Sequence, residues 1–268
     1  MPSLPLPRAI LDYELSESGA DPASPLVVQL HGLTSSRARD AELGLDLVAG
    51  LTGHRVARYD ARGHGASTGD PDPASYQWGA LAQDLMSLLD VLAPGQAVHG
   101  VGQSMGAGTL LHAAVAAPQR FESLVLGIPP TAWSTRAAQR RTYLSHAQAV
   151  EREGVEALLA QEASSPTPPA VDADRPRARP TVTAELLPAV FAGAAATDLP
   201  APHRLAALAM PTLLLAWVDD PAHPLSTAQR LHELMPHSRL VVARTPADTH
   251  TWTALVADHV ERTSELVR

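Results

Sequence analysis

This 268-residue chain contains neither cysteine nor lysine. Without cysteine the chain has no thiol nucleophile, no thiolate zinc site and no disulfide. Without lysine it has no Schiff-base chemistry, no P-loop lysine and no lysine general base. All twenty basic residues are arginine. Any enzyme chemistry must therefore come from other side chains.

Positive charge and long apolar runs are also scarce. The net charge of −8 argues against a nucleic-acid binder, which normally carries a basic face. No apolar stretch approaches the roughly 20 residues that span a bilayer. The segment 1–8 lacks the basic region and long apolar core of a signal peptide. We therefore expect a cytoplasmic protein that acts on a small molecule and binds neither nucleic acid nor membrane. The oligomeric state cannot be inferred from the sequence.

Short runs rich in valine and leucine alternate with helical patterns along most of the chain. The strand candidates are Leu26–Leu30, Arg55–Tyr59, Val98–Val101, Leu124–Leu126, Thr212–Ala216 and Leu240–Ala243. The helix candidates are Ala41–Leu51, Trp78–Leu92, Gly106–Ala117, Ser226–Met235 and Trp252–Val267. This alternation predicts an α/β fold with a mostly parallel, doubly wound sheet covered on both faces. Functional residues in such sheets gather at the carboxyl ends of the strands.

The segment 131–198 departs from this alternation of strands and helices. A helical stretch, Trp133–Leu159, is followed by Ser164–Pro180, which is too rich in proline for a helix or a central strand. A short helix is expected at Glu185–Ala195. We predict an inserted helical lid at 131–198, with the core domain formed by 1–130 and 199–268. An unstructured linker fits 164–180 equally well.

The pentapeptide Gly102-Gln103-Ser104-Met105-Gly106 joins a predicted strand to a predicted helix. In that setting Gly-x-Ser-x-Gly is typical of a nucleophile elbow, a tight turn that strains the serine backbone and tolerates only glycine on either side. The Ser104 hydroxyl is then expected to project from the carboxyl edge of the sheet. The amide of Met105 is expected to face a developing oxyanion. A buried glycine-rich turn explains the pentapeptide alone nearly as well, so the partners of Ser104 decide between the two.

A serine hydroxyl needs a base to take its proton, and the base needs a carboxylate to orient it. The carboxylate is expected at the end of a later strand, where Asp219 and Asp220 follow Ala216. The base is expected after the last strand, where His250 stands. Histidine suits this role because its pKa lies near working pH.

Four motifs, each after a predicted strand, resemble those of the α/β-hydrolase superfamily. They are His31-Gly32-Leu33-Thr34, Asp60-Ala-Arg-Gly-His-Gly-Ala-Ser67, the elbow around Ser104, and Asp220-Pro-Ala-His-Pro224. The resemblance covers nearly all of the chain outside the predicted lid. It implies a catalytic triad of Ser104, Asp220 and His250, with Asp220 favoured over Asp219. It also implies an oxyanion hole formed by the backbone amides of Leu33 and Met105.

The sequence departs from the family pattern at two positions. Trp217 stands where the acid loop usually begins with glycine, and Thr249 precedes His250 where glycine is usual. The other histidines are given supporting roles: His31 and His64 brace loops, His223 lies beside the acid loop or at the surface, and His259 is a weak rival of His250. No His-x-x-x-His pair indicates a metal site, and we expect no cofactor.

These observations favour a serine hydrolase, an esterase that cleaves a small carboxylic ester or lactone through an acyl-enzyme on Ser104. The same fold and triad also serve C–C bond hydrolysis, acyl transfer and perhydrolysis, and a small-ligand binder without turnover is a further alternative. The predicted lid has few aromatic residues, which favours small acyl groups. Its arginines, Arg140, Arg141, Arg175, Arg177 and Arg179, either bind an anionic substrate or form a solvated face.

Overall fold

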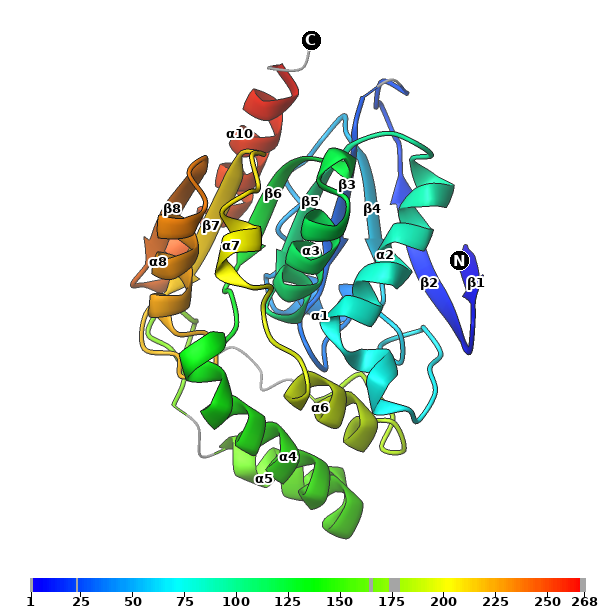
Figure 1. Cartoon of the computed structure of the whole chain (residues 1–268), viewed down its shortest axis with the longest axis vertical. Helices are drawn as coiled ribbons and strands as arrows, with labels where there is room; N and C mark the ends of the chain where they lie inside the picture. The colour runs from blue at the N-terminus through cyan, green and yellow to red at the C-terminus, as the bar shows by residue number, and fades with distance from the viewer. Residues whose placement is uncertain (1, 23, 164–165, 174–178, 266–268) are drawn as a thin grey trace.

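The centre of the molecule is an eight-stranded sheet with helices on both faces (Figure 1). This computed structural model describes residues 2–22, 24–163, 166–173 and 179–265. The strands are β1 (Ser3–Leu6), β2 (Ala9–Ser16), β3 (Leu26–Leu30), β4 (Arg55–Tyr59), β5 (Val98–Gln103), β6 (Phe121–Gly127), β7 (Thr212–Trp217) and β8 (Ser238–Ala243). Their order across the sheet is β1-β2-β4-β3-β5-β6-β7-β8.

The α-helices are α1 (Arg37–Glu42), α2 (Trp78–Leu92), α3 (Met105–Ala116), α4 (Arg136–Glu153), α5 (Val155–Ala163), α6 (Leu187–Ala195), α7 (Pro202–Leu205), α8 (Leu225–Leu234), α9 (Pro246–Thr249) and α10 (Trp252–Glu265). Three 3₁₀ turns, η1 (Pro73–Tyr76), η2 (Pro118–Arg120) and η3 (Trp133–Thr135), complete the described elements. Strands and helices alternate through most of this order, as the apolar runs predict.

The strands from β3 to β8 are parallel, whereas β1 and β2 are antiparallel. In β3 all five residues are buried. Val28 packs into the cluster on one face of the sheet, and Val27 into the cluster on the other. A strand buried on both faces reads as a continuous apolar run, which is why β3 is visible in the sequence. The predicted α/β-hydrolase fold, mostly parallel and doubly wound, is confirmed.

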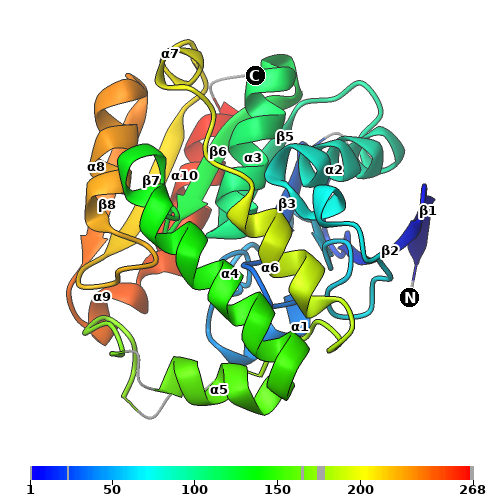
Figure 2. The same ribbon diagram turned by 60° about the horizontal axis from the view of Figure 1, so that its bottom comes forward.

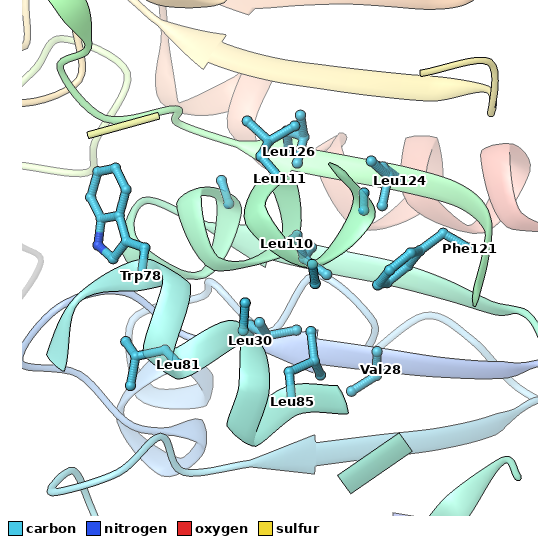
Figure 3. Packing of buried hydrophobic residues seen from close by; sticks show 14 of the residues in the cluster. Val28, Leu30, Trp78, Leu81, Leu85, Leu110, Leu111, Phe121, Leu124 and Leu126 are labelled. Atoms are coloured by element: carbon cyan, nitrogen blue, oxygen red, sulfur yellow. The ribbon is translucent and has the colours of Figure 1, made fainter. Parts of the chain in front are cut away.

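The larger core lies between the sheet and the helices α2 and α3. Figure 3 shows Leu85 of α2, Leu110 of α3 and Val28 of β3 pointing into the same apolar layer. On the opposite face the apolar side of α10 packs against Val125 and Leu213. These two layers fix α3 against β3 and β5, and so fix the position of the residue from which α3 starts.

The helices α4, α5 and α6 lie together at one end of the sheet (Figures 1 and 2). They are connected between β6 and β7 and share a cluster of buried residues that includes Val150, Leu158 and Phe191. The described residues of 164–180, namely 166–173 and 179–180, form turns and coil. The lid boundaries 131 and 198 stay a prediction.

Two predicted helices differ from the structure because glycine interrupts them. The helix expected at Ala41–Leu51 is wrong: α1 ends at Glu42, and Gly44 takes a positive φ of 66°. The single helix expected at Trp133–Leu159 is divided into α4 and α5 at Gly154, whose φ is 81°. Such φ values belong to the left-handed region, where glycine is favoured because it has no Cβ.

Candidate active site

Ser104 occupies a strained turn between β5 and α3. Its φ of 51° and ψ of −112° are unfavourable for a residue with a side chain. A Cβ on Gly102 would lie 2.6 Å from the carbonyl oxygen of Gly106, and a Cβ on Gly106 would lie 2.5 Å from that of Leu30. Both glycines are therefore required for β5, α3 and β3 to approach this closely. The turn has the form of the nucleophile elbow that the pentapeptide predicts.

The side chain that meets Ser104 comes from the loop after β7. The Nε2 atom of His223 lies 2.8 Å from the Oγ of Ser104. The other ring nitrogen, Nδ1, lies 2.8 Å from Oδ2 of Asp220. Hydroxyl, imidazole and carboxylate therefore form one continuous chain of hydrogen bonds, the arrangement that activates a serine.

The structure corrects the predicted pairing of His250 with Ser104. His250 follows α9, and its Nε2 lies 3.1 Å from Oδ2 of Asp172. The His250 side chain is 66% exposed, whereas that of His223 is 19% exposed. The physical reason is the turn at α9, where Thr245 and Asp248 form a capping box at the amino end of the helix. This turn directs His250 toward Asp172.

A signal in the sequence could have identified His223. Residues three apart in a tight turn bring their side chains together, and Asp220 and His223 have this spacing. A second signal is Thr249, which stands before His250 where the family usually has glycine. The position after the last strand favours His250 as the base, and on that ground alone His223 is left a supporting or surface role.

Asp220 is held by four donors. Its Oδ1 accepts from the backbone amides of Ala222, at 2.9 Å, and His223, at 3.3 Å. Its Oδ2 accepts from the indole Nε1 of Trp217 at 2.8 Å, in addition to the His223 ring. Burial raises the pKa of Asp220, but the bonds and charge of His223 and the bonds from Trp217 and Ala222 outweigh it and lower the pKa to about 2. Asp220 is therefore ionised across the physiological range.

Asp219, the alternative acid, takes a different role in the same loop. Its φ of 59° places it in the left-handed region, which aspartate tolerates better than most residues. This turn reverses the chain just after β7 and presents Asp220 to His223. Of the two candidates, the structure brings Asp220 into the chain of hydrogen bonds with Ser104.

A cavity of about 240 Å³ opens beside Ser104 and His223. It is lined by Gly32, Leu33, Thr34, Ser35, Arg39, Asp40, Leu43, Leu45, Gln103, Ser104, Ile128, Trp217 and His223. Leu33 lies in this wall, and Met105 is the first residue of α3, directly after Ser104. Within the described part of the chain, the backbone amides of Leu33 and Met105 donate no hydrogen bond to another protein group.

A second cavity of about 250 Å³ lies on the other side of Trp217. Leu43, Leu45 and Trp217 contribute to the walls of both cavities. The second cavity is also lined by Trp252 and by the pair of His250 and Asp172. His250 therefore faces a space separated from Ser104 by side chains.

Four further histidines are buried: His31, His64, His99 and His259. The Nε2 of His31 accepts from the backbone amide of Ala61 at 2.9 Å, and the Nδ1 of His64 lies 2.8 Å from the carbonyl oxygen of Arg62. These contacts brace the loops after β3 and β4. Burial is the largest cause of lowered pKa in all four, to about 3 for His64 and about 4 for the others.

The lid arginines, for which anion binding and a solvated face were the alternatives, do not gather at Ser104 in the part of the chain that is described. Arg140 and Arg141 are exposed on α4, and Arg179 pairs with Glu156 at 2.9 Å. Arg175 and Arg177 lie outside the described residues. Over the described ranges, no helix is both long and apolar enough to cross a membrane.

The fold agrees with comparisons with known proteins. The family model described as alpha/beta hydrolase fold matches residues 25–247. The chain therefore belongs to the α/β-hydrolase family.

Individual relatives are hydrolases of several kinds. A putative carbamate hydrolase RutD from Pseudomonas savastanoi pv. phaseolicola is 31% identical over 230 residues, covering 82% of this chain and 85% of that protein. The sn-1-specific diacylglycerol lipase ABHD11 of Mus musculus is 37% identical over 147 residues, covering 55% of this chain. The match spans less than half, 45%, of the length of that lipase. The crystal structure of a hydrolase from Pseudomonas aeruginosa PA01 superposes with a TM-score of 0.74 at 28% identity, covering 95% of this chain and 94% of that one.

Proposed function

We propose that this protein is a serine hydrolase that cleaves small carboxylic esters or lactones through an acyl-enzyme on Ser104. The observation that carries the proposal is the continuous hydrogen-bonded chain from Ser104 through His223 to Asp220, with 2.8 Å at each step. A serine in a strained elbow with no base beside it would be a structural turn. A serine with an oriented imidazole beside it is a nucleophile.

In the proposed reaction the Nε2 of His223 takes the proton from the Ser104 hydroxyl as the oxygen attacks the substrate carbonyl. Asp220 holds the imidazole through Nδ1 and stabilises its positive charge. The backbone amides of Leu33 and Met105 donate hydrogen bonds to the oxyanion, which is supported by their lack of an acceptor among the described residues. The protonated His223 then gives its proton to the leaving alcohol. Water, deprotonated by the same imidazole, releases the acid and restores Ser104.

The size of the catalytic cavity supports small substrates. Its volume of about 240 Å³ is below the roughly 300–1,000 Å³ typical of sites that enclose drug-sized ligands. Leu33, Leu43 and Ile128 offer apolar surface to an acyl group, while Ser104 and His223 lie in the same wall. Short acyl chains and small lactones fit this description better than long-chain lipids.

A second candidate substrate class is a small carbamate. It is favoured by the relative named a putative carbamate hydrolase, which matches over most of both chains. The same nucleophile, base and acid would attack a carbamate carbonyl, and the product would then lose carbon dioxide. Quantifying the acid, alcohol, amine and carbon dioxide released from matched ester and carbamate substrates separates the two classes.

The helices α4, α5 and α6 are proposed to act as a lid over the catalytic cavity. Their position at one end of the sheet, between β6 and β7, supports this role. The cytoplasmic location and the lack of nucleic-acid and membrane partners remain predictions from composition.

The proposal is tested by labelling the protein with a fluorophosphonate probe, with Ser104→Ala as the matched control. Labelling of the wild-type protein that maps to the peptide containing Ser104, and its loss in Ser104→Ala, is expected. Hydrolysis of p-nitrophenyl acetate should disappear in the same variant. Full esterase activity in a folded Ser104→Ala protein would contradict the mechanism, and absence of labelling in the folded wild type would contradict activation of Ser104.

A further inference from the structure

Trp217 is the last residue of β7 and stands where the acid loops of related sequences usually begin with glycine. Its side chain is buried and forms part of the wall between the two cavities. One face of the indole stacks on Trp252, with ring centroids 5.8 Å apart and an angle of 23° between the planes. The ring of His223 meets it edge-on, with centroids 6.3 Å apart at 80°. The indole is therefore fixed in orientation by packing on two sides.

The polar edge of this fixed indole is directed at the acid. The Nε1–H of Trp217 donates to Oδ2 of Asp220 at 2.8 Å. The same oxygen accepts the hydrogen bond from Nδ1 of His223, also at 2.8 Å. The two N–H groups therefore share one carboxylate oxygen. Each bond withdraws electron density from that oxygen, so the bond from Trp217 weakens the attraction of Asp220 for a proton and for the His223 ring.

We propose that Trp217 is a positioning residue that orients Asp220 and sets the pH at which the Ser104–His223 pair becomes active. The inference rests on the proposed function of that pair. The indole acts through Asp220 and takes no part in bond making. By donating to Oδ2, it moderates the negative charge that stabilises the protonated imidazole.

The indole bond also limits rotation of the carboxylate. The backbone amides of Ala222 and His223 hold Oδ1, and the indole of Trp217 holds Oδ2. With both oxygens restrained, the lone pair of Oδ2 stays directed at Nδ1 of His223. Removal of the indole bond leaves Oδ2 bonded to the His223 ring alone, and the imidazole loses part of its fixed orientation toward Ser104.

Other titratable or charged groups surround this unit, and none of them is altered in sequence when the indole is replaced. They are Tyr143 on α4, Arg39 and Asp40 on α1 in the catalytic cavity, Asp219 in the loop itself, and His250 with Asp172 in the second cavity. All of these groups are present in both variants compared below. A difference in the pH dependence of activity between the two variants is therefore attributed to the indole bond.

The test compares Trp217→Phe with Trp252→Phe. Trp217→Phe keeps an aromatic ring in the wall but has no N–H to donate to Asp220. Trp252→Phe changes the stacking partner, and its own Nε1 has no hydrogen-bond partner in the described structure. The measured quantities are kcat and KM for p-nitrophenyl acetate between pH 5 and 9, and the rate of fluorophosphonate labelling over the same range.

For Trp217→Phe we expect the acidic limb of kcat/KM to move to higher pH by on the order of one unit. At the plateau we expect kcat to fall about tenfold with little change in KM, because orientation is lost and substrate contacts are kept. In Trp252→Phe the acidic limb of kcat/KM should stay at the wild-type pH. A Trp217→Phe protein with wild-type activity and an unmoved limb would overturn the inference. Inactive, unlabelled wild-type protein would instead overturn the proposed function.

A measurement on the wild-type protein keeps the inference testable if Trp217→Phe folds poorly. The chain has four tryptophans, so [15N]tryptophan labelling gives four indole signals. The Trp217 signal is assigned by elimination with single phenylalanine variants at the other three positions. We expect this proton to be shifted downfield by its bond to the carboxylate, and to titrate with the same midpoint as the acidic limb of activity. A Trp217 signal that is insensitive to pH over this range would refute the coupling.

Discussion

Replacing His223 by alanine removes the imidazole that lies 2.8 Å from the Ser104 hydroxyl and leaves the elbow unchanged. The serine then has no base to take its proton, and Asp220 has no ring to orient. We expect kcat/KM for p-nitrophenyl acetate to fall about 10⁴-fold, which corresponds to about 5.5 kcal/mol of transition-state stabilisation. Residual activity is expected, because the amides of Leu33 and Met105 remain available to the oxyanion.

The matched control is His250→Ala. His250 and Asp172 form an exposed pair, with side chains 66% and 48% exposed, and exposed pairs contribute about 0–1 kcal/mol to stability. We therefore expect His250→Ala to keep kcat/KM within about threefold of the wild type. Both variants should be assayed at pH 8, with circular dichroism to confirm that each is folded.

The opposite result would refute the reasoning. If folded His250→Ala were inactive while folded His223→Ala kept most of its activity, the base would come from the segment after β8. The contact between His223 and Ser104 would then be a resting arrangement of the loop. Loss of activity in both variants, with wild-type folding, would mean that the two histidines act together.

Two further predictions concern the stability of the fold. The four buried histidines have lowered pKa values in the folded protein. Above about pH 6.5 they leave the free energy of unfolding unchanged. As the pH falls from there toward about 4, the free energy of unfolding decreases, because the unfolded chain binds protons that the folded chain excludes. The expected loss in the free energy of unfolding is about 1.4 kcal/mol per histidine per pH unit. Urea unfolding at pH 7.5 and at pH 5.5 measures this loss. Equal urea midpoints at the two pH values would contradict the prediction. Gly106→Ala should cost about 3 kcal/mol, because its Cβ would lie 2.5 Å from the Leu30 carbonyl oxygen. Gly79→Ala in α2, with no neighbour closer than 3.8 Å, is the control, and equal melting temperatures for the two variants would refute the close-packing argument.

The parallel sheet could be predicted from the sequence because its strands are buried on both faces. Continuous apolar runs such as Leu26–Leu30 and Thr212–Ala216 are informative for that reason. The antiparallel strands β1 and β2 are less distinct: only one side of each faces the core, and the residues of β1 alternate between exposed and half-buried. The helix boundaries were less predictable where a glycine in the left-handed region ended a helix early, as at Gly44.

At the candidate site, the sequence was most informative where chemistry and local backbone geometry coincide. Ser104 could be predicted because the elbow needs glycine on both sides, and those glycines are visible in the sequence. The partner of Ser104 could not be predicted in the same way, because it depends on the paths of two loops in space. The caps of α9 direct His250 to Asp172, while the turn at Asp219 directs His223 to Ser104. A family motif gives the positions of residues along the chain, and the direction in which each loop points its histidine cannot be read from it.

The short loop after β7 has a consequence for how the molecule tolerates change. Asp220 and His223 lie within one four-residue turn, and the backbone amides of that turn hold the carboxylate. The spacing between acid and base is therefore a local property, independent of how the far edge of the sheet is placed. Under this arrangement β8, α9 and α10 contribute none of the three side chains in the hydrogen-bonded chain and serve for packing, including the packing of Trp252 on Trp217. Substitutions and small backbone shifts in the residues after this turn would then be limited mainly by their effect on stability. That part of the chain would diverge faster than its position beside the site suggests.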